Sequence, residues 1–182
     1  MRVGPYEIKA PLIFGGADNE AEVLGASVWL WMHSPMHRDA PLHALPTLLL
    51  PIIKRRLYVL IMETERPVFF LSWAWLNPES EARYLTRPAI EMPEADWNSG
   101  DRMWFCDWIA PFGHTAAMNA LMRQDIFADH CARALYHRGE QRGKRVVMFH
   151  GRRVSRVQAR AWQQAHPLAV DLPEAFKGLN HE

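Results

Sequence analysis

Apolar side chains gather in short stretches along the chain, and the residues between these stretches indicate where helices and strands end. Asn19 is suited to cap a helix that should run to about residue 33, since two glutamates follow in its first turn. The pair Ser34-Pro35 ends this helix, because a residue before proline avoids helical geometry and proline cannot donate the next backbone hydrogen bond. His37 therefore falls on a turn directly after the helix.

The other apolar stretches predict a mixed order of strands and helices. Runs rich in Val, Ile, Leu, Phe and Trp predict strands at residues 57–62, 68–76, 102–110 and 145–150. The first two strands should form a hairpin. Further helices are predicted at residues 79–85, 115–123, 126–136 and 155–164. This order predicts an α/β fold.

The organisation of the chain predicts a single domain. The sequence contains no internal repeat, low-complexity tract or long linker, so we expect residues 19–166 to fold as one unit. Residues 1–18 are rich in Gly and Pro and predict an irregular N-terminal arm, and residues 167–182 predict a C-terminal tail. With 182 residues, 49% of them hydrophobic, the chain is long enough to bury one core.

Composition and charge argue against several classes of protein. The formal net charge is +1, so the molecule as a whole is not built to coat nucleic acid or an anionic membrane. The longest apolar run, residues 45–53, is far shorter than the ~20 residues that span a bilayer, so we expect no transmembrane segment. The N-terminus lacks the apolar core of a signal peptide, and Cys106 and Cys131 form no CxxC pair, so we expect a cytoplasmic protein.

Asp107 is the most informative single residue, because it lies inside the apolar strand Met103-Trp104-Phe105-Cys106-Asp107-Trp108-Ile109. A carboxylate in such a place is costly to bury unless a cation or hydrogen-bond donors meet it. Either an arginine such as Arg102 forms a salt bridge with it, or it belongs to a functional site. In a regular strand the Cys106 side chain points away from Asp107, and this cysteine is then expected to be a buried, inert thiol.

His37 is a candidate for proton transfer. Loops held by a rigid scaffold commonly carry catalytic groups, and histidine takes up and returns protons near neutral pH. A partner carboxylate would fix the tautomer of the imidazole. Because the chain contains nine histidines, position alone does not separate a catalytic histidine from a bystander. A zinc hydrolase that uses His33, His37 and His43 is an alternative, but Pro35 breaks the helical spacing of the first two, so no metal site is predicted.

The balance of charge shifts strongly between residues 133 and 160. This stretch contains one acidic side chain, Glu140, and several basic ones: Arg138, Arg142, Lys144, Arg145, Arg152, Arg153 and Arg156. Such a stretch binds an acidic protein or a phosphate, or it is an ordinary solvated face. Gly139 and Gly143 do not indicate a phosphate-cradling loop, because a strand and not a helix is predicted after them.

Five collinear segments resemble the RTX-toxin-activating lysine acyltransferases. They are Trp29-Leu30-Trp31, Ser34-Pro35-Met36-His37-Arg38, Ser72-Trp73-Ala74, Asp96-Trp97-Asn98-Ser99-Gly100-Asp101-Arg102 and Asp107-Trp108-Ile109-Ala110-Pro111-Phe112-Gly113. The last segment is long enough to be highly specific, and a weaker likeness continues to about residue 151. Ala40 departs from the pattern, because the family often has tryptophan there.

The resemblance implies a fold and an activity. The fold would be a single-domain, GNAT-like acyltransferase fold with a mixed, largely antiparallel sheet flanked by helices. The enzyme would be a protein-lysine N-acyltransferase that activates an RTX protoxin. It would take a fatty acyl chain from acyl carrier protein, place it on internal lysine ε-amino groups, and need no tightly bound cofactor. His37 and Asp107 fall on the family's catalytic histidine and aspartate.

These expectations assign roles to individual residues. His37 would act as general base in a direct transfer, and Asp107 would orient its imidazole. We further expect substrate-binding roles for Trp31, Ser34, Arg38, Trp73, Arg102, Arg142, Arg152 and Arg153. The many tryptophans would form either the apolar wall of an acyl site or ordinary core. A non-catalytic chaperone that binds the protoxin is the main rival. The sequence leaves open the acyl chain length, the target lysines and whether the chain forms a homodimer.

Overall fold

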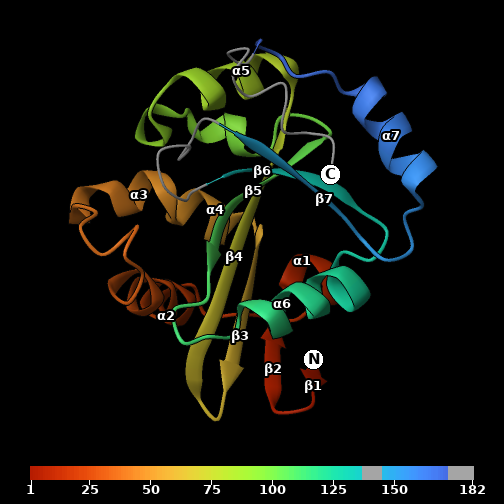
Figure 1. The fold of residues 1–182 in the computed structure, drawn as a ribbon. Helices are drawn as coiled ribbons and strands as arrows, with labels where there is room; N and C mark the ends of the chain where they lie inside the picture. Colours follow the sequence, from red (N-terminus) through yellow and green to blue (C-terminus); the bar gives the residue numbers. More distant parts are fainter. Residues whose placement is uncertain (137–144, 172–182) are drawn as a thin grey trace.

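The computed structural model describes residues 1–136 and 145–171. One seven-stranded sheet runs through these residues in the order β1-β2-β3-β4-β5-β6-β7 (Figure 1). Every neighbouring pair of strands is antiparallel except β5 and β6, which confirms the expected mixed sheet. The strands cover Arg2–Val3, Tyr6–Lys9, Tyr58–Glu63, Arg66–Leu76, Arg102–Ile109, Cys131–Leu135 and Val146–His150.

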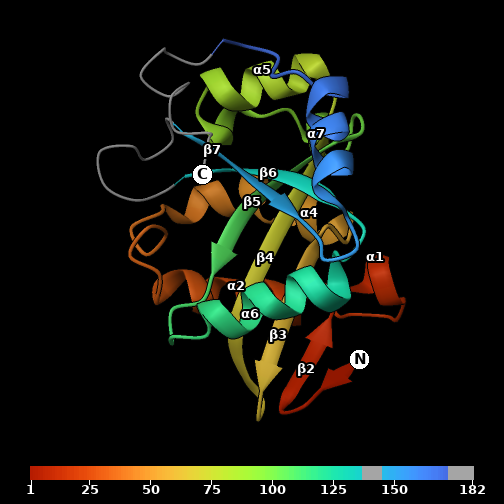
Figure 2. The same ribbon diagram turned by 45° about the vertical axis from the view of Figure 1, so that its right-hand side comes forward.

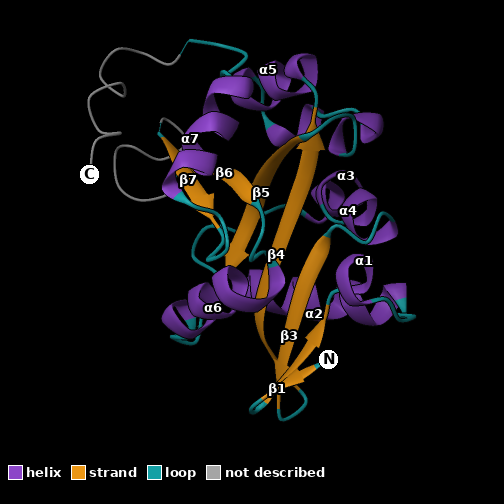
Figure 3. Cartoon of the chain, turned by 90° about the vertical axis from the view of Figure 1, so that its right-hand side faces the viewer, coloured by secondary structure: helices purple, strands orange, loops and turns teal. Residues whose placement is uncertain are grey.

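Helices flank this sheet. The α-helices α1 to α7 cover Pro11–Phe14, Glu20–Met32, Leu45–Leu48, Leu50–Lys54, Pro78–Thr86, Thr115–Leu121 and Arg156–Ala165. Shorter helical turns η1 to η4 cover Leu42–Ala44, Ala89–Glu91, Glu94–Trp97 and Met122–Ile126. α2 and α6 lie on opposite sides of the β3–β4 hairpin (Figures 1 and 3). Among the described residues, none of the helices combines the length and apolar character needed to span a bilayer.

Helix α2 begins and ends close to the predicted residues. The Asn19 side chain accepts hydrogen bonds from the backbone N–H groups of Ala21 and Glu22, at 2.9 and 3.2 Å. The helix ends at Met32, three residues before Pro35. The chain then enters the turn that carries His37, so the cap and the proline together decide where this histidine lies.

Strand β4 forms the centre of the core. Phe69, Phe70, Leu71 and Trp73 are all buried, although successive side chains of a strand point to opposite faces. Both faces of the sheet are therefore covered here, which explains why β4 is apolar on both faces and does not alternate between apolar and polar residues, apart from Ser72.

Two predictions of secondary structure need correction. Residues 126–136 are not a helix: the chain makes the π-helical turn η4 and then forms β6, which lies between β5 and β7. Pairing with two neighbouring strands outweighs the helix propensity of the alanines in this segment. Residues 1–18 are more regular than the irregular arm that their glycines and prolines predict, because β1 pairs with β2 and β2 pairs with β3.

The sheet is irregular on both sides of β5. Toward β6, the register pairs only Trp104 with Arg133 and Phe105 with Ala134, and the two strands then diverge (Figure 2). Toward β4, Trp73 lies opposite Phe105 but the preceding Ser72 lies opposite Asp107, so Cys106 is an extra residue in β5. This is a β-bulge, a feature that re-aims side chains. It occurs directly beside Asp107.

Candidate active site

Ser72 on β4 holds the carboxylate of Asp107 on β5. The Ser72 hydroxyl donates a hydrogen bond to Oδ2 of Asp107, and the backbone N–H of Asp107 donates to Ser72 Oγ at 3.1 Å. Ser72 is fully buried, so this contact is shielded from water. Arg102 binds Glu81 instead of Asp107, so the salt bridge between Arg102 and Asp107 that the sequence left open is not formed.

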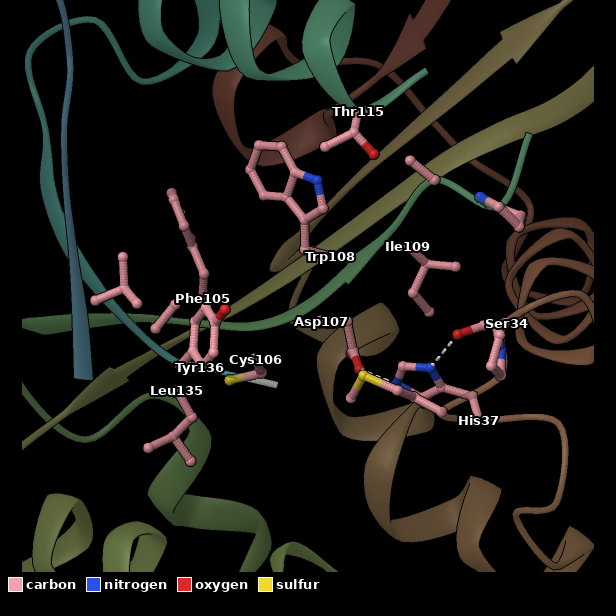
Figure 4. Close-up of a pocket in the computed structure, with 16 residues that line it drawn as sticks. Ser34, His37, Phe105, Cys106, Asp107, Trp108, Ile109, Thr115, Leu135 and Tyr136 are labelled. Carbon is pink, nitrogen blue, oxygen red and sulfur yellow. Dashed lines mark hydrogen bonds and ion pairs between the residues drawn. The ribbon is translucent and has the colours of Figure 1, made fainter. Parts of the chain in front are cut away.

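The turn after α2 brings His37 to Asp107. Nε2 of His37 lies 3.2 Å from Oδ1 of Asp107, and Nδ1 lies 2.8 Å from Oγ of Ser34 (Figure 4). The backbone N–H groups of His37 and Arg38 both donate to the carbonyl of Ser34, which closes the turn. The ring of Trp31 lies 4.9 Å from the imidazole, centroid to centroid. The imidazole is therefore held at both nitrogens and along one side of its ring.

The partners of the two nitrogens determine where the protons lie. The Asp107 carboxylate lies 3.2 Å from Nε2, so the neutral imidazole keeps its proton on that nitrogen, and Nδ1 accepts a hydrogen bond from the Ser34 hydroxyl. When the imidazole is protonated, Nδ1–H donates to Ser34 Oγ. Ser34, His37 and Asp107 thus contact one another in series, an arrangement in which a proton can be taken up and returned at Nδ1 without moving a heavy atom.

Two cavities meet at this chain of groups. The cavity between the diverging ends of β5 and β6, here named the sheet cavity, has a volume of about 630 Å³ (Figure 4). The second, here named the helix cavity, has a volume of about 600 Å³ and is lined by residues of α3, α4, α5, η2 and η3. Both cavities are lined by Met36, His37, Cys106, Asp107 and Leu135. A reacting group at the histidine can therefore extend in two directions.

Cys106 lies where a regular strand would not place it. The bulge in β5 turns its side chain toward the same two cavities as Asp107, so the expectation that it points away from Asp107 is wrong. Burial, with a smaller contribution from the charge of Asp107, raises the pKa of the Cys106 thiol well above its ordinary value. The thiol therefore stays protonated at neutral pH and is a poor nucleophile.

Four other candidate residues lie in three different environments: beside a cavity, on the His37 turn and in the core. Trp31 lines the helix cavity, and Arg38 lies on the His37 turn, 3.7 Å from Asp39. Trp73 is buried against Phe127, with ring centroids 5.2 Å apart. The structure does not bring Trp73 or the buried Arg102 to either cavity.

Arg152, Arg153 and the histidines His33 and His43 of the alternative zinc site line neither cavity. Arg142 falls outside the described residues. Arg152 and Arg153 follow β7, and Arg153 donates to the Asp129 carboxylate at 2.7 Å. His33 lies between the rings of Trp29 and Phe112, which are tilted relative to the imidazole, with ring centroids 4.5 and 5.2 Å away. Within residues 1–136 and 145–171, no group of three or more His, Cys, Asp or Glu side chains is placed to hold a metal ion.

Ser72 is the site residue that the sequence did not identify. The available signal is a single hydroxyl within the apolar run of β4, in the strand that pairs with the strand of Asp107. Without the register of the two strands this signal is weak, and a bulge shifts that register by one residue directly beside Ser72.

Comparisons with known proteins identify one matching family and several similar proteins. The model of the RTX toxin acyltransferase family matches residues 17–150. The RTX-I toxin-activating lysine-acyltransferase ApxIC of Actinobacillus pleuropneumoniae is 42% identical over 149 residues, which cover 81% of this chain and 86% of that protein. The leukotoxin-activating lysine-acyltransferase LtxC of Aggregatibacter actinomycetemcomitans is 40% identical over 150 residues, or 82% and 88% of the two chains. A protein-lysine myristoyltransferase HlyC of Escherichia coli is 40% identical over 135 residues, or 74% and 78%.

Proposed function

Because this chain belongs to the RTX toxin acyltransferase family, we propose that it activates an RTX protoxin by transferring a fatty acyl group to internal lysine side chains. Similar proteins are named toxin-activating lysine acyltransferases or protein-lysine myristoyltransferases. The observation that carries the mechanism is the His37–Asp107 pair, 3.2 Å apart, at the junction of two cavities. A proton carrier that is held by a carboxylate and open to two binding spaces suits a transfer between two substrates.

We propose that the acyl donor is the thioester of acyl carrier protein and that the fold is GNAT-like. In support, β5 leaves β6 after two paired positions, which opens one edge of β5 to the sheet cavity. Backbone groups on an open strand edge suit an extended, amide-bearing arm such as that of a carrier protein. We also propose that the enzyme acts in the cytoplasm, and the two free cysteines, Cys106 and Cys131, support a reducing compartment.

The reaction forms an amide bond and breaks the C–S bond of the thioester. The uncharged lysine nitrogen attacks the carbonyl carbon, and the electron pair of the C=O bond moves onto oxygen. When this pair returns, the carrier thiolate leaves. The attacking amine loses one proton, His37 gains one, and His37 then gives one proton to the thiolate, so atoms and charge balance. Asp107 stabilises the imidazolium that exists between these two steps.

The position of Ser34 makes it part of the proton route. Its hydroxyl is hydrogen-bonded to Nδ1 of His37, the ring nitrogen that carries no proton in the neutral imidazole. Ser34 also lines the sheet cavity. The amine therefore gives its proton to Ser34 Oγ as the Ser34 hydroxyl proton moves to Nδ1. This route needs no acyl-enzyme, because the serine oxygen ends the step with a proton and not with an acyl group.

Intact mass of a co-expressed RTX protoxin tests the proposed function. Acylation adds the mass of one acyl chain to each modified lysine, whereas a chaperone without catalytic activity leaves the mass unchanged. The direct route is tested separately by mixing the enzyme with acyl carrier protein thioester alone, quenching in acid and mapping peptide masses. We expect no acyl group on the enzyme. A kinetically competent adduct on His37 or Ser34 would replace direct transfer with a two-step route.

A further inference from the structure

Glu81 binds β5 and β6 at the end where these two strands are still paired. The pairs are Trp104 with Arg133 and Phe105 with Ala134, and beyond them the strands diverge around the sheet cavity. Glu81 of α5 is fully buried. Its Oε1 accepts hydrogen bonds from Nε1 of Trp104 and from the Arg133 guanidinium, both at 2.8 Å. One carboxylate therefore joins two residues that face each other across the strand pair.

The segment that follows α7, residues 166–169, completes the surroundings of this carboxylate and is here named the strap. The backbone N–H of Ala169 donates a hydrogen bond to Oε2 of Glu81 at 2.9 Å. Arg133 in turn donates to the backbone carbonyl of His166. The strap lies at the same end of the sheet as α5 (Figures 1 and 2) and lines neither cavity.

Two buried arginines depend on the strap for acceptors. Arg102 of β5 donates to Glu81 and also to the carbonyl of Pro167, at 2.7 Å, and Arg133 of β6 uses the strap in the same way. Both arginines are buried, and a buried donor that loses its acceptor is costly. Without the strap, each guanidinium would have to move toward water to recover an acceptor. Because each guanidinium is attached to a strand, such a movement would displace β5 and β6.

The displacement would reach the active site through the strands themselves. In β6 and directly after it, Arg133 is followed by Ala134, Leu135 and Tyr136, and all three line the sheet cavity. Arg102 begins the strand that carries Asp107. The width of the sheet cavity is therefore linked to a segment that contacts neither the cavity nor the proton-transfer residues.

We propose that the strap is a positioning element of the enzyme, which holds β5 and β6 at the separation at which the sheet cavity takes the acyl donor. This inference rests on the proposed function, because the donor is the group that the cavity is proposed to hold. The strap touches no reacting atom and acts through Glu81 and the two arginines. Such indirect support matters, because a misplacement of about 1 Å can cost about 100-fold in rate.

Ala169→Pro in the full-length enzyme tests the strap, because proline lacks the N–H that Glu81 accepts. We expect the apparent KM for acyl carrier protein thioester to rise by about tenfold, the factor that one hydrogen bond to a charged group is worth. The KM for protoxin should stay unchanged. Partial unfolding would instead lower the maximal rate and leave both KM values as they are. Val170→Pro is the matched control, since within residues 1–136 and 145–171 the Val170 N–H donates no hydrogen bond.

A second measurement needs no acyl transfer. Cys106 lines the sheet cavity, so the rate of its alkylation by iodoacetamide reports how far β5 and β6 open. Cys131→Ser leaves Cys106 as the one cysteine of the chain. In this background we expect Ala169→Pro to speed the alkylation of Cys106 by about tenfold, and Val170→Pro to leave it unchanged.

Equal KM values and equal alkylation rates for folded Ala169→Pro and Val170→Pro would overturn the proposal. Faster alkylation with an unchanged KM would overturn it too, because the strands would then open without consequence for the donor. Should Ala169→Pro fail to fold, as circular dichroism would show, Trp162→Leu decides by the same two readings, since the Trp162 ring lies 5.1 Å from the Arg133 guanidinium. A wild-type enzyme that acylates no lysine would refute the proposed function, and the alkylation rates alone would then decide whether the strap holds the strands.

Discussion

At the scale of single residues, His37 can move a proton because its two ring nitrogens have different kinds of partner. The Asp107 carboxylate lies 3.2 Å from Nε2 and is itself fixed by the buried hydroxyl of Ser72, so the charge of the carboxylate favours the tautomer with its proton on Nε2. Ser34 at Nδ1 both donates and accepts, so that side stays hydrogen-bonded in either protonation state.

Replacing the histidine tests this arrangement directly. We expect His37→Ala to lower the rate of protoxin acylation on the order of 100-fold or more, because it removes the proton-transfer group. The measurement is the initial rate with saturating donor, together with circular dichroism to confirm the fold. His43→Ala is the matched control, since His43 is exposed and lines neither cavity. Near-normal acylation by folded His37→Ala would exclude the proton-transfer role.

The coupling between histidine and aspartate gives a second prediction. Asp107→Asn keeps the shape of the side chain but removes the charge that stabilises the imidazolium, so we expect a large loss of rate with little loss of stability. The double variant of His37→Ala and Asp107→Asn should be about as slow as His37→Ala alone, because the aspartate acts through the histidine. Losses that add as independent effects would show that the two residues do not act as a unit.

The sequence identifies a site residue when its local chemistry is unusual. It does not identify a site residue whose position depends on the pairing register of two strands. Asp107 is conspicuous as a carboxylate inside an apolar strand, and Pro35 places His37 on a turn. Ser72 and the orientation of Cys106 could not be predicted in the same way, because both depend on one extra residue in β5. A slip of one residue turns every later side chain of a strand to the other face.

At the scale of secondary-structure elements, one buried carboxylate ties together segments that are far apart in the sequence. Glu81 of α5 is fully buried. Its oxygens accept hydrogen bonds from Arg102 of β5, Arg133 of β6 and the backbone N–H of Ala169 near the end of the described chain. Arg102 and Arg133 in turn donate to the backbone carbonyls of Pro167 and His166, so the segment after α7 is bound to the sheet.

Removing the charge of Glu81 should weaken this junction strongly. We expect Glu81→Gln to lower the free energy of unfolding by about 3–5 kcal/mol, because two buried arginines lose their counter-charge. Equilibrium denaturation in urea measures this change. Glu79→Gln on the same helix is the matched control, since the Glu79 side chain is 79% exposed, and we expect a change within about 0.5 kcal/mol. An equally small effect of both substitutions would contradict the argument.

The same junction explains why one element was predicted wrongly. Residues 131–135 carry two alanines and a leucine, which favour a helix, and nothing local indicates a strand. Arg133 is 3% exposed in β6, and its partner Glu81 is 52 residues away in the chain. Elements whose limits are local signals, such as the Asn19 cap and Pro35 for α2, were predicted close to their actual bounds. β6 is decided by long-range pairing, which a single sequence does not display.

At the scale of the whole molecule, stability should depend on pH through carboxylates that are paired with arginines. Asp96 is buried, and Arg83 donates to both of its oxygens, at 2.6 and 2.8 Å. The Arg83 guanidinium lowers the pKa of the Asp96 carboxyl below its ordinary value. The arginines Arg55 and Arg153 likewise lower the pKa values of Glu94 and Asp129.

The sign of the pH dependence follows from these lowered pKa values. The folded state holds the Asp96 proton less tightly than the unfolded state, so the stability from this pair is complete above the unfolded pKa of about 4 and is lost as the pH falls through the folded pKa. We expect Asp96→Asn to be less stable at neutral pH and to lose less stability between about pH 4 and pH 2 than the wild type. Urea denaturation across this range measures both effects. Parallel curves for the two proteins would contradict the prediction.

Docking of the proposed donor, acyl carrier protein, also concerns the whole molecule, and the basic residues lie at different distances from the sheet cavity. The Arg145 guanidinium lies 5.4 Å from the centre of the Tyr136 ring, and Tyr136 lines the sheet cavity. Arg152 and Arg156 follow the other end of β7. The five residues of β7, from Val146 to His150, place its two ends about 13 Å apart. Of Arg145, Arg152 and Arg156, Arg145 is therefore the one that lies beside the sheet cavity.

Charge reversal at the two ends of this stretch gives the last prediction. Arg145→Glu should raise the apparent KM for acyl carrier protein by about tenfold at low salt, because acyl carrier protein is acidic and rim charges chiefly affect encounter. Arg156→Glu makes the same change of charge at the start of α7 and should raise this KM less than about twofold. Both differences should shrink as salt screens the charges, while kcat at saturating donor and the KM for protoxin stay unchanged. Equal effects of the two substitutions, or an Arg145→Glu effect that does not depend on salt, would mean that the carrier protein does not dock beside the sheet cavity.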